Sequence, residues 1–189
     1  MSLLGTVLGA LWAMLPAYVP NNAAVLFGGG RPLDGGRNLG ERRILGDGKT
    51  WRGTVAGIGA GVLVAGLLNV VRERASDAVG LPTAGDPAET LPSFPPRAAL
   101  VLPAGAMLGD TLASFLKRRT GRERGAAFPL VDQLDFVTVA VTLTALLVPD
   151  WFEETFTPAR LLVVTVVTPA LHLLANGAAY LLGLKDEPW

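Results

Sequence analysis

Two polar residues at helical spacing stand out near the middle of the chain. Asp110 and Ser114 lie four residues apart inside an apolar run, so a helix would carry them on one face. An ionised carboxylate in such a run is costly unless it is paired or binds a cation. The alternatives are therefore a structural ion pair, with Arg118 as the nearest candidate, or a functional cation site.

A second acidic group follows in Pro129-Leu130-Val131-Asp132-Gln133-Leu134-Asp135. The spacing of Asp132 and Asp135 places both carboxylates on one side of the first turn of a helix. Helix capping explains Asp132 alone more readily than the pair. With Asp110 they form an all-oxygen set suited to Mg²⁺, which keeps several waters and is completed by substrate phosphates. We therefore predict a magnesium site of the kind used in nucleotidyl transfer.

Two glycine-rich segments, residues 27–34 and 45–53, combine glycines with cations and hydroxyls. Glycine lets backbone N–H groups close around phosphate oxygens, and the second segment opens a helix whose N-terminus attracts anions. It is not a P-loop, because Arg43 replaces the first glycine and no strand precedes it. The alternative is a basic loop that sets topology and touches anionic lipid. The candidate substrate-binding residues of these two segments are Gly29, Gly30, Arg31, Asp47, Lys49, Thr50 and Arg52.

Another polar pair, His172 and Asn176, lies near the C-terminus at a spacing of four. Both side chains should face the protein rather than lipid, and an interhelical hydrogen bond is a more common role for such a pair than a substrate contact. With one histidine and no cysteine in the chain, a His-only metal site and any thiolate chemistry are excluded.

The elements that must position these residues are transmembrane helices. The composition is 50% hydrophobic and only 17% charged, against roughly 25% charged in a soluble domain. Runs long enough to cross a bilayer predict a single all-α domain over residues 1–189. The fourth run, Phe136–Val148, is short for a crossing, but it could extend back through Asp132 if the carboxylates there face a protein-lined cavity. The five predicted spans are Met1–Val19, Gly53–Val71, Arg97–Leu116, Phe136–Val148 and Leu161–Leu184.

The distribution of basic residues predicts how the spans are oriented. The loops 20–52 and 117–135 are strongly basic, the latter through Lys117, Arg118, Arg119, Arg122 and Arg124, whereas the loops 72–96 and 149–160 are mixed. The positive-inside rule then places both basic loops and the C-terminus in the cytoplasm and the N-terminus outside. The first run lacks the features of a signal peptide, so we expect a mature helix. A net charge of +0 argues against a nucleic-acid-binding surface.

Taken together, these motifs resemble the CDP-archaeol synthase family, membrane cytidylyltransferases of archaea. The resemblance covers nearly the whole chain: Pro16-Ala17-Tyr18 leading to Asn21 and Asn22, both glycine-rich segments, Gly109–Arg119, residues 129–136, and His172 with Asn176. Residues 109–135 are also similar to the signature of CDP-diacylglycerol synthases. That signature has a glycine-histidine-glycine segment where Leu130 and Val131 stand here, so the lipid assignment follows the archaeal pattern.

The resemblance implies a five-helix cell-membrane enzyme, with its active site facing the cytoplasm. It would transfer CMP from CTP to an unsaturated ether-lipid glycerol phosphate, giving CDP-archaeol and pyrophosphate. The implied catalytic residues are Asp110, Asp132, Asp135 and Lys117, with the three aspartates holding Mg²⁺. The implied substrate-binding residues are Asn21, Asn22, Ser114, Arg118 and Arg119, together with the substrate-binding candidates of the two glycine-rich segments given above.

Two other functions compete with this interpretation. A small transporter or a structural membrane subunit is the alternative from another class, but a transporter favours mid-membrane charges in broken helices or an internal repeat. A CDP-alcohol phosphotransferase needs an Asp-Gly-x-x-Ala-Arg context, and Asp47-Gly48 is not followed by Ala-Arg. The sequence therefore favours the cytidylyltransferase.

Overall fold

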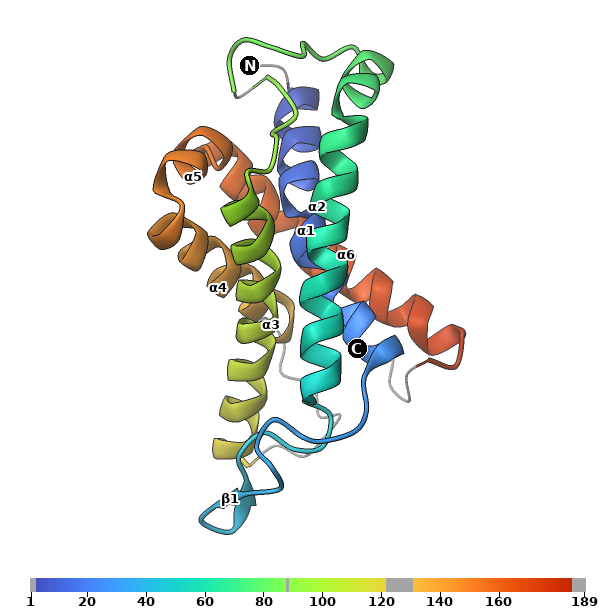
Figure 1. Cartoon of the computed structure of the whole chain (residues 1–189), viewed down its shortest axis with the longest axis vertical. Helices are drawn as coiled ribbons and strands as arrows, with labels where there is room; N and C mark the ends of the chain where they lie inside the picture. Colours follow the sequence, from blue (N-terminus) through green and yellow to red (C-terminus); the bar gives the residue numbers. More distant parts are fainter. Residues whose placement is uncertain (1–2, 88, 122–130, 185–189) are drawn as a thin grey trace.

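The computed structural model describes residues 3–87, 89–121 and 131–184 (Figure 1). The predicted helical class is confirmed, with one short antiparallel hairpin added in the first loop. In chain order, the elements of the described residues are α1 (Leu3–Phe27), β1 (Asn38–Leu39), β2 (Arg42–Arg43), α2 (Trp51–Val79), α3 (Pro96–Arg119), α4 (Val131–Leu147), α5 (Pro149–Thr155) and α6 (Pro158–Leu181).

Four of the described helices, α1, α2, α3 and α6, are long and apolar enough to cross a membrane. They correspond to four of the five predicted spans. The predicted short span is present as α4, whose 17 residues begin at Val131, so the helix does include Asp132 and Asp135. At 1.5 Å per residue it is about 25 Å long, somewhat less than a hydrocarbon core of roughly 30 Å.

Two predicted helix ends were wrong. Helix α1 continues to Phe27 rather than stopping at Val19, so Asn21 and Asn22 lie in the helix and not in the first loop. Pro16 and Pro20 lie inside α1, which a transmembrane helix tolerates where neighbouring helices pack against the freed backbone. Helix α2 continues to Val79 through a charged stretch and ends at a left-handed Gly80. In addition, the segment 149–160, which was predicted as a loop, contains the short helix α5.

Small residues allow two helix pairs to pack closely. On α2, Gly57 and Gly61 face α1: a Cβ there would lie 2.7 Å from the Pro20 carbonyl oxygen and 2.5 Å from that of Pro16, respectively. On α3, a Cβ at Gly109 would lie 2.6 Å from the Cα of Phe136 in α4. Such spacing is typical of membrane helix interfaces, where small residues let backbones approach. The Gly109 contact brings Asp110 beside the first turns of α4.

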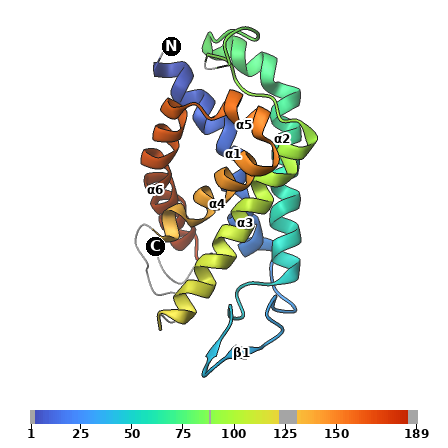
Figure 2. The same ribbon diagram turned by 90° about the vertical axis from the view of Figure 1, so that its left-hand side faces the viewer.

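At one end of the bundle an extended segment, residues 90–94, ties the helices together. Each of its five carbonyl oxygens accepts a hydrogen bond from a side chain of α1, α2, α5 or α6. The donors are Arg160 to Thr90 at 2.7 Å, Arg72 to Leu91 at 3.4 Å, Trp12 to Pro92 at 3.0 Å, Trp151 to Ser93 at 2.6 Å and Asn69 to Phe94 at 2.8 Å. We call this segment the strap. Figure 2 shows that the strap end of the molecule lies opposite the β1–β2 hairpin, so the two loop systems cap different ends.

Candidate active site

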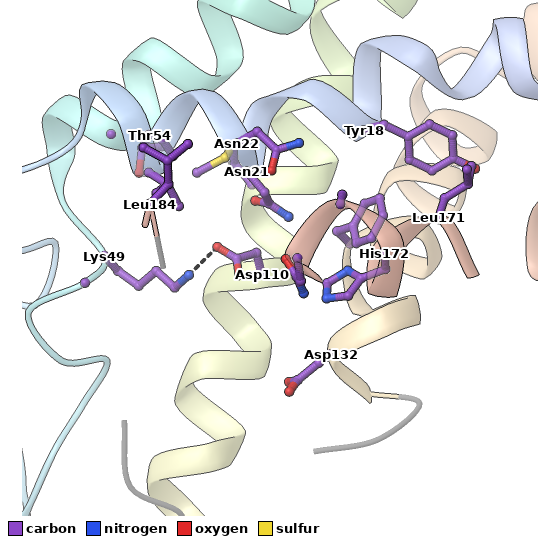
Figure 3. A pocket seen from close by; sticks show the side chains of 18 of the residues that line it. Tyr18, Asn21, Asn22, Lys49, Thr54, Asp110, Asp132, Leu171, His172 and Leu184 are labelled. Atoms are coloured by element: carbon purple, nitrogen blue, oxygen red, sulfur yellow. Dashed lines mark hydrogen bonds and ion pairs between the residues drawn. The ribbon is translucent and has the colours of Figure 1, made fainter. Parts of the chain in front are cut away.

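A cavity of about 840 Å³ opens between α1, α3, α4, α6 and the loop before α2 (Figure 3). Its charged side chains come from the loop, α3 and α4, whereas its neutral polar side chains come mainly from α1 and α6. The charged members are Lys49, Asp110, Lys117 and Asp132, and the neutral ones on α1 and α6 are Tyr18, Asn21, Asn22, Thr168, His172 and Asn176. The cavity therefore has one charged wall and one neutral wall.

Two lysine–aspartate ion pairs form the charged wall. Lys49 Nζ lies 2.5 Å from the Asp110 carboxylate, and Lys117 Nζ lies 2.7 Å from that of Asp132. The four side chains are between 20% and 25% exposed, so each pair is accessible from the cavity. The ion pair predicted as an alternative, Asp110 with Arg118, is not the one formed: the partner of Asp110 is Lys49. The wall thus holds two cations and two carboxylates with no net charge.

The first turn of α2 fixes the position of Lys49. Thr50 caps this helix, as the sequence predicts for a segment that opens one: its hydroxyl accepts a hydrogen bond from the Gly53 N–H at 3.1 Å. The Leu33 N–H donates to the Lys49 carbonyl at 2.8 Å, and the Trp51 N–H donates to the Arg31 carbonyl at 3.2 Å. The two glycine-rich segments are therefore bonded side by side, and Lys49 is held where it reaches α3.

Asp34 organises the rest of this loop. Its side chain has no exposed surface, and it accepts hydrogen bonds at 3.0 Å from the N–H groups of Gly36, Leu45 and Gly46. The Arg43 guanidinium also binds it, at 2.8 Å. That guanidinium, helped by the backbone donors, holds the pKa of the Asp34 carboxyl well below its usual range. Asp34 is therefore ionised at neutral pH and serves as the centre of the loop.

Helix α3 anchors the hairpin through its last residues. Arg119 donates to the carbonyl oxygens of Leu39 and Arg43, both at 2.7 Å, and Arg118 donates to that of Leu45 at 3.4 Å. These two arginines were predicted to bind substrate. In the structure they bind the backbone of the first loop and hold it against α3.

The structure brings seven of the predicted site residues together in the cavity lining, namely Asn21, Asn22, Lys49, Thr50, Asp110, Lys117 and Asp132. The other predicted residues lie outside that lining: Gly29, Gly30, Arg31, Asp47, Arg52, Ser114, Arg118, Arg119 and Asp135. Asp47 binds Arg43 at 2.7 Å, and the Ser114 hydroxyl donates to the Asp110 carbonyl within α3. The predicted Arg122, Arg124, Pro129 and Leu130 fall outside the described residues.

Sequence reasoning did not predict how several aromatic and hydroxyl residues come together in the cavity. The Tyr18 hydroxyl lies 2.8 Å from that of Thr168, linking α1 to α6. The Phe136 ring is edge-on to Tyr18 at 5.9 Å and stacked on His172 at 6.3 Å. Tyr18 belongs to the Pro16-Ala17-Tyr18 motif and Thr168 to an apolar run, but neither signal reveals a contact between residues 150 positions apart.

The predicted magnesium ligands can be tested against this geometry. Within the described residues, no three carboxylate or imidazole groups form a ready-made metal cluster. Asp110 and Asp132 nevertheless line the same cavity. Because Mg²⁺ commonly takes one or two carboxylates and completes its shell with water and substrate phosphates, this oxygen donor set suits it. The metal roles of Asp110, Asp132 and Asp135 all stay predictions.

Comparison with known proteins gives a consistent result. The CarS-like family model, described as CDP-archaeol synthase, matches residues 3–189. The CDP-archaeol synthase of Halobacterium salinarum is 65% identical over the full length of both chains. That of Methanosarcina barkeri is 46% identical over 93% of this chain and all of its own.

A solved structure, described as an intramembrane enzyme for archaeal membrane lipids biosynthesis, also matches. It is 34% identical, covers 90% of this chain and 94% of its own, and superposes with a TM-score of 0.69. The family model and the solved structure each match nearly the whole chain. The chain belongs to the CDP-archaeol synthase family.

Proposed function

We propose that this protein transfers CMP from CTP to an unsaturated archaeal ether-lipid glycerol phosphate, giving CDP-archaeol and pyrophosphate. The observation that carries this proposal is the charged wall, in which two cations and two carboxylates line one cavity. A reaction between a nucleoside triphosphate and a phosphate monoester needs cations for the phosphates and oxygen ligands for a metal. Family membership supports CDP-archaeol synthesis in membrane lipid production.

The two ion pairs indicate how the residues act. On nucleotide binding, Lys49 and Lys117 exchange their aspartate partners for oxygens of the triphosphate. The carboxylates of Asp110 and Asp132, released from the lysines, would hold Mg²⁺, and the metal would supply charge neutralisation at the phosphates. The lysines thereby stabilise the negative charge that grows on the departing pyrophosphate. We extend the metal role to Asp135, next to Gly109 in the α3–α4 contact.

A lipid phosphate oxygen attacks the α-phosphorus of CTP, and the bond to the β-phosphate bridging oxygen breaks. No strong general base is required, because a phosphate monoester with a second pKa of about 6 is mostly dianionic at neutral pH. The site must mainly align two anions and offset their repulsion. Apolar lining residues on α1 and α6, such as Leu15, Val25 and Leu171, offer a surface for the lipid chains.

We also propose that residues 1–189 form one catalytic unit in the cell membrane, with α4 as a fifth crossing. The N-terminus would lie outside and the active site would face the cytoplasm. Support comes from the basic residues of the first loop and of the end of α3, which lie together at the end opposite the strap. CTP is a cytoplasmic metabolite, so this orientation is also the one in which the cavity meets its substrate.

The decisive experiment follows radiolabel from CTP in detergent-purified protein supplied with Mg²⁺ and an ether-lipid phosphate. Label at the α-phosphate should enter a chloroform-extractable product, while label at the γ-phosphate should stay in the aqueous phase as pyrophosphate. Entry of γ-label into lipid would indicate phosphoryl transfer and contradict the proposal. The absence of both, from a preparation that folds, would favour a transporter or structural subunit.

Three variants locate the chemistry. Asp110→Asn and Asp132→Asn should each abolish incorporation of the α-label. Asp77→Asn is the matched control, since this exposed aspartate lies on α2 near the strap end. It should incorporate label at the wild-type rate.

CTP should also raise the melting temperature of the wild type but not that of an unrelated membrane protein.

A further inference from the structure

Asn21 carries a buried hydrogen-bond acceptor that lacks a donor. Its side-chain oxygen, Oδ1, is shielded from solvent and has no hydrogen-bond partner among the residues the structure describes. Asn21 lines the cavity, and Figure 3 shows it projecting from α1 into the space that Lys49 and Asp110 enter from other elements. A buried carbonyl oxygen without a donor is costly, so in a cavity wall it indicates a ligand that brings the donor.

The chemistry of the substrates limits which group can supply that donor. This step rests on the proposed function. The lipid phosphate offers phosphate and ether oxygens, which only accept hydrogen bonds, and the triphosphate of CTP likewise only accepts. The remaining donors on CTP are the exocyclic amine of cytosine and the two ribose hydroxyls. Among the substrate groups, only those of the nucleoside can therefore donate to Asn21 Oδ1.

Aromatic rings in the same cavity favour the base over the sugar. They come from α1, α4 and α6: His172 is stacked on Phe136 at 6.3 Å, and Tyr18 is edge-on to Phe136 at 5.9 Å. Stacked rings form a platform for a flat base, and base–aromatic stacking does not depend on base identity. Identity must therefore be read by a hydrogen bond at the edge of the base.

From this geometry we infer that Asn21 Oδ1 accepts a hydrogen bond from the exocyclic amine of cytosine and thereby selects CTP over UTP. Uracil presents a carbonyl oxygen where cytosine presents the amine. With UTP bound, two acceptors would face each other and Asn21 Oδ1 would stay unsatisfied. A site built around a buried polar group discriminates strongly against a ligand that leaves this group unpaired.

The inference is tested by binding measurements on the full-length protein with Mg²⁺, using CTP, UTP, dCTP and a CTP analogue with hydrogen in place of the 4-amino group. The wild type should bind CTP at least about tenfold more tightly than UTP and more tightly than the analogue. In Asn21→Ala, the affinity for CTP should fall to near that for the analogue. The ratio of CTP to dCTP should be unchanged.

Controls separate this role from a folding defect. Leu26 lies on the same helix as Asn21, is outside the cavity lining and is 58% exposed. The variant Leu26→Ala should therefore keep the wild-type preference for CTP. If Asn21→Ala does not fold, Asn21→Leu, which is similar in size and has no hydrogen-bond acceptor, takes its place, with the nucleotide-free melting temperature as the check on folding.

Two results would overturn the inference. One is an unchanged CTP-to-UTP ratio in a folded Asn21 variant, and the other is a collapsed CTP-to-dCTP ratio, which would assign Asn21 to the ribose. In either case the wild type would still move the α-label of CTP into lipid, so the proposed function would stand. Failure of that transfer in the wild type would instead remove the proposed function.

Discussion

Replacing Lys49 by methionine tests whether Lys49 binds Asp110 only until the triphosphate of CTP takes the place of that carboxylate. Lys49→Met keeps the length and apolar volume of the side chain but removes the ammonium that lies 2.5 Å from the Asp110 carboxylate. At an effective dielectric constant of about 20, two unit charges about 4 Å apart attract by about 4 kcal/mol. Because the two side chains are 25% and 24% exposed, solvent screening and desolvation reduce this to about 1–2 kcal/mol.

Loss of this attraction should strengthen Mg²⁺ binding, and loss of the ammonium should weaken CTP binding. Without its lysine, Asp110 is unmasked, so nucleotide-free Lys49→Met should bind Mg²⁺ about tenfold more tightly than the wild type. The same variant should bind CTP in the absence of metal about tenfold more weakly, since one phosphate-binding cation is lost. Both affinities can be measured by isothermal titration calorimetry on detergent-purified protein.

The control is Arg74→Met, which removes one positive charge from an exposed position near the other end of α2. It should leave both affinities at wild-type values. If Lys49→Met bound Mg²⁺ no better than the wild type while Arg74→Met behaved normally, Lys49 would not be masking Asp110. The exchange of partners in the proposed mechanism would then be refuted.

Two further predictions concern the loop and the helix packing. The folded pKa of Asp34 lies below its unfolded value of about 4, so its stabilisation should be full above that pH and be lost as the pH falls further. Asp34→Asn should melt at a lower temperature at pH 7 and lack this acid-dependent loss, and parallel wild-type and variant melting curves between pH 7 and 3 would contradict this. Gly61→Ala should destabilise the protein by about 1–3 kcal/mol, because its Cβ would meet the Pro16 carbonyl oxygen at 2.5 Å. Gly59→Ala, whose Cβ would have no neighbour within 4 Å, should be neutral or slightly stabilising, and equal effects at both positions in denaturant unfolding would contradict the packing argument.

Hydrophobic runs predicted the helices well, because a segment that crosses a bilayer must be apolar over most of its length. The ends were harder to predict where local signals conflict with tertiary packing. The predicted first span ended at Val19, just before Pro20, but α2 presents glycines to the carbonyls of Pro16 and Pro20 and the helix continues to Phe27. This one boundary decides whether Asn21 is a loop residue or part of the neutral wall of the cavity.

The charged wall was predictable because carboxylates beside apolar runs have few structural explanations. Asp110, Asp132, Lys49 and Lys117 were all identified from the sequence and all line the cavity. The neutral wall was only partly identified. Tyr18 meets Thr168 only because α1 packs on α6, and no spacing along the chain encodes that contact.

Arginines and lysines at this end of the bundle have different roles, which the number of basic residues in the sequence does not predict. Arg43 and Arg119 each bind two or more oxygens of the first loop, which suits a planar guanidinium with five donors. Lys49 and Lys117 instead carry compact charges into the cavity on flexible stems, and such a charge can change partners without disturbing the loop. Neither side chain should therefore replace the other. Arg119→Lys would loosen the hairpin, and Lys49→Arg would hold Asp110 by a bidentate bond that resists replacement by the triphosphate.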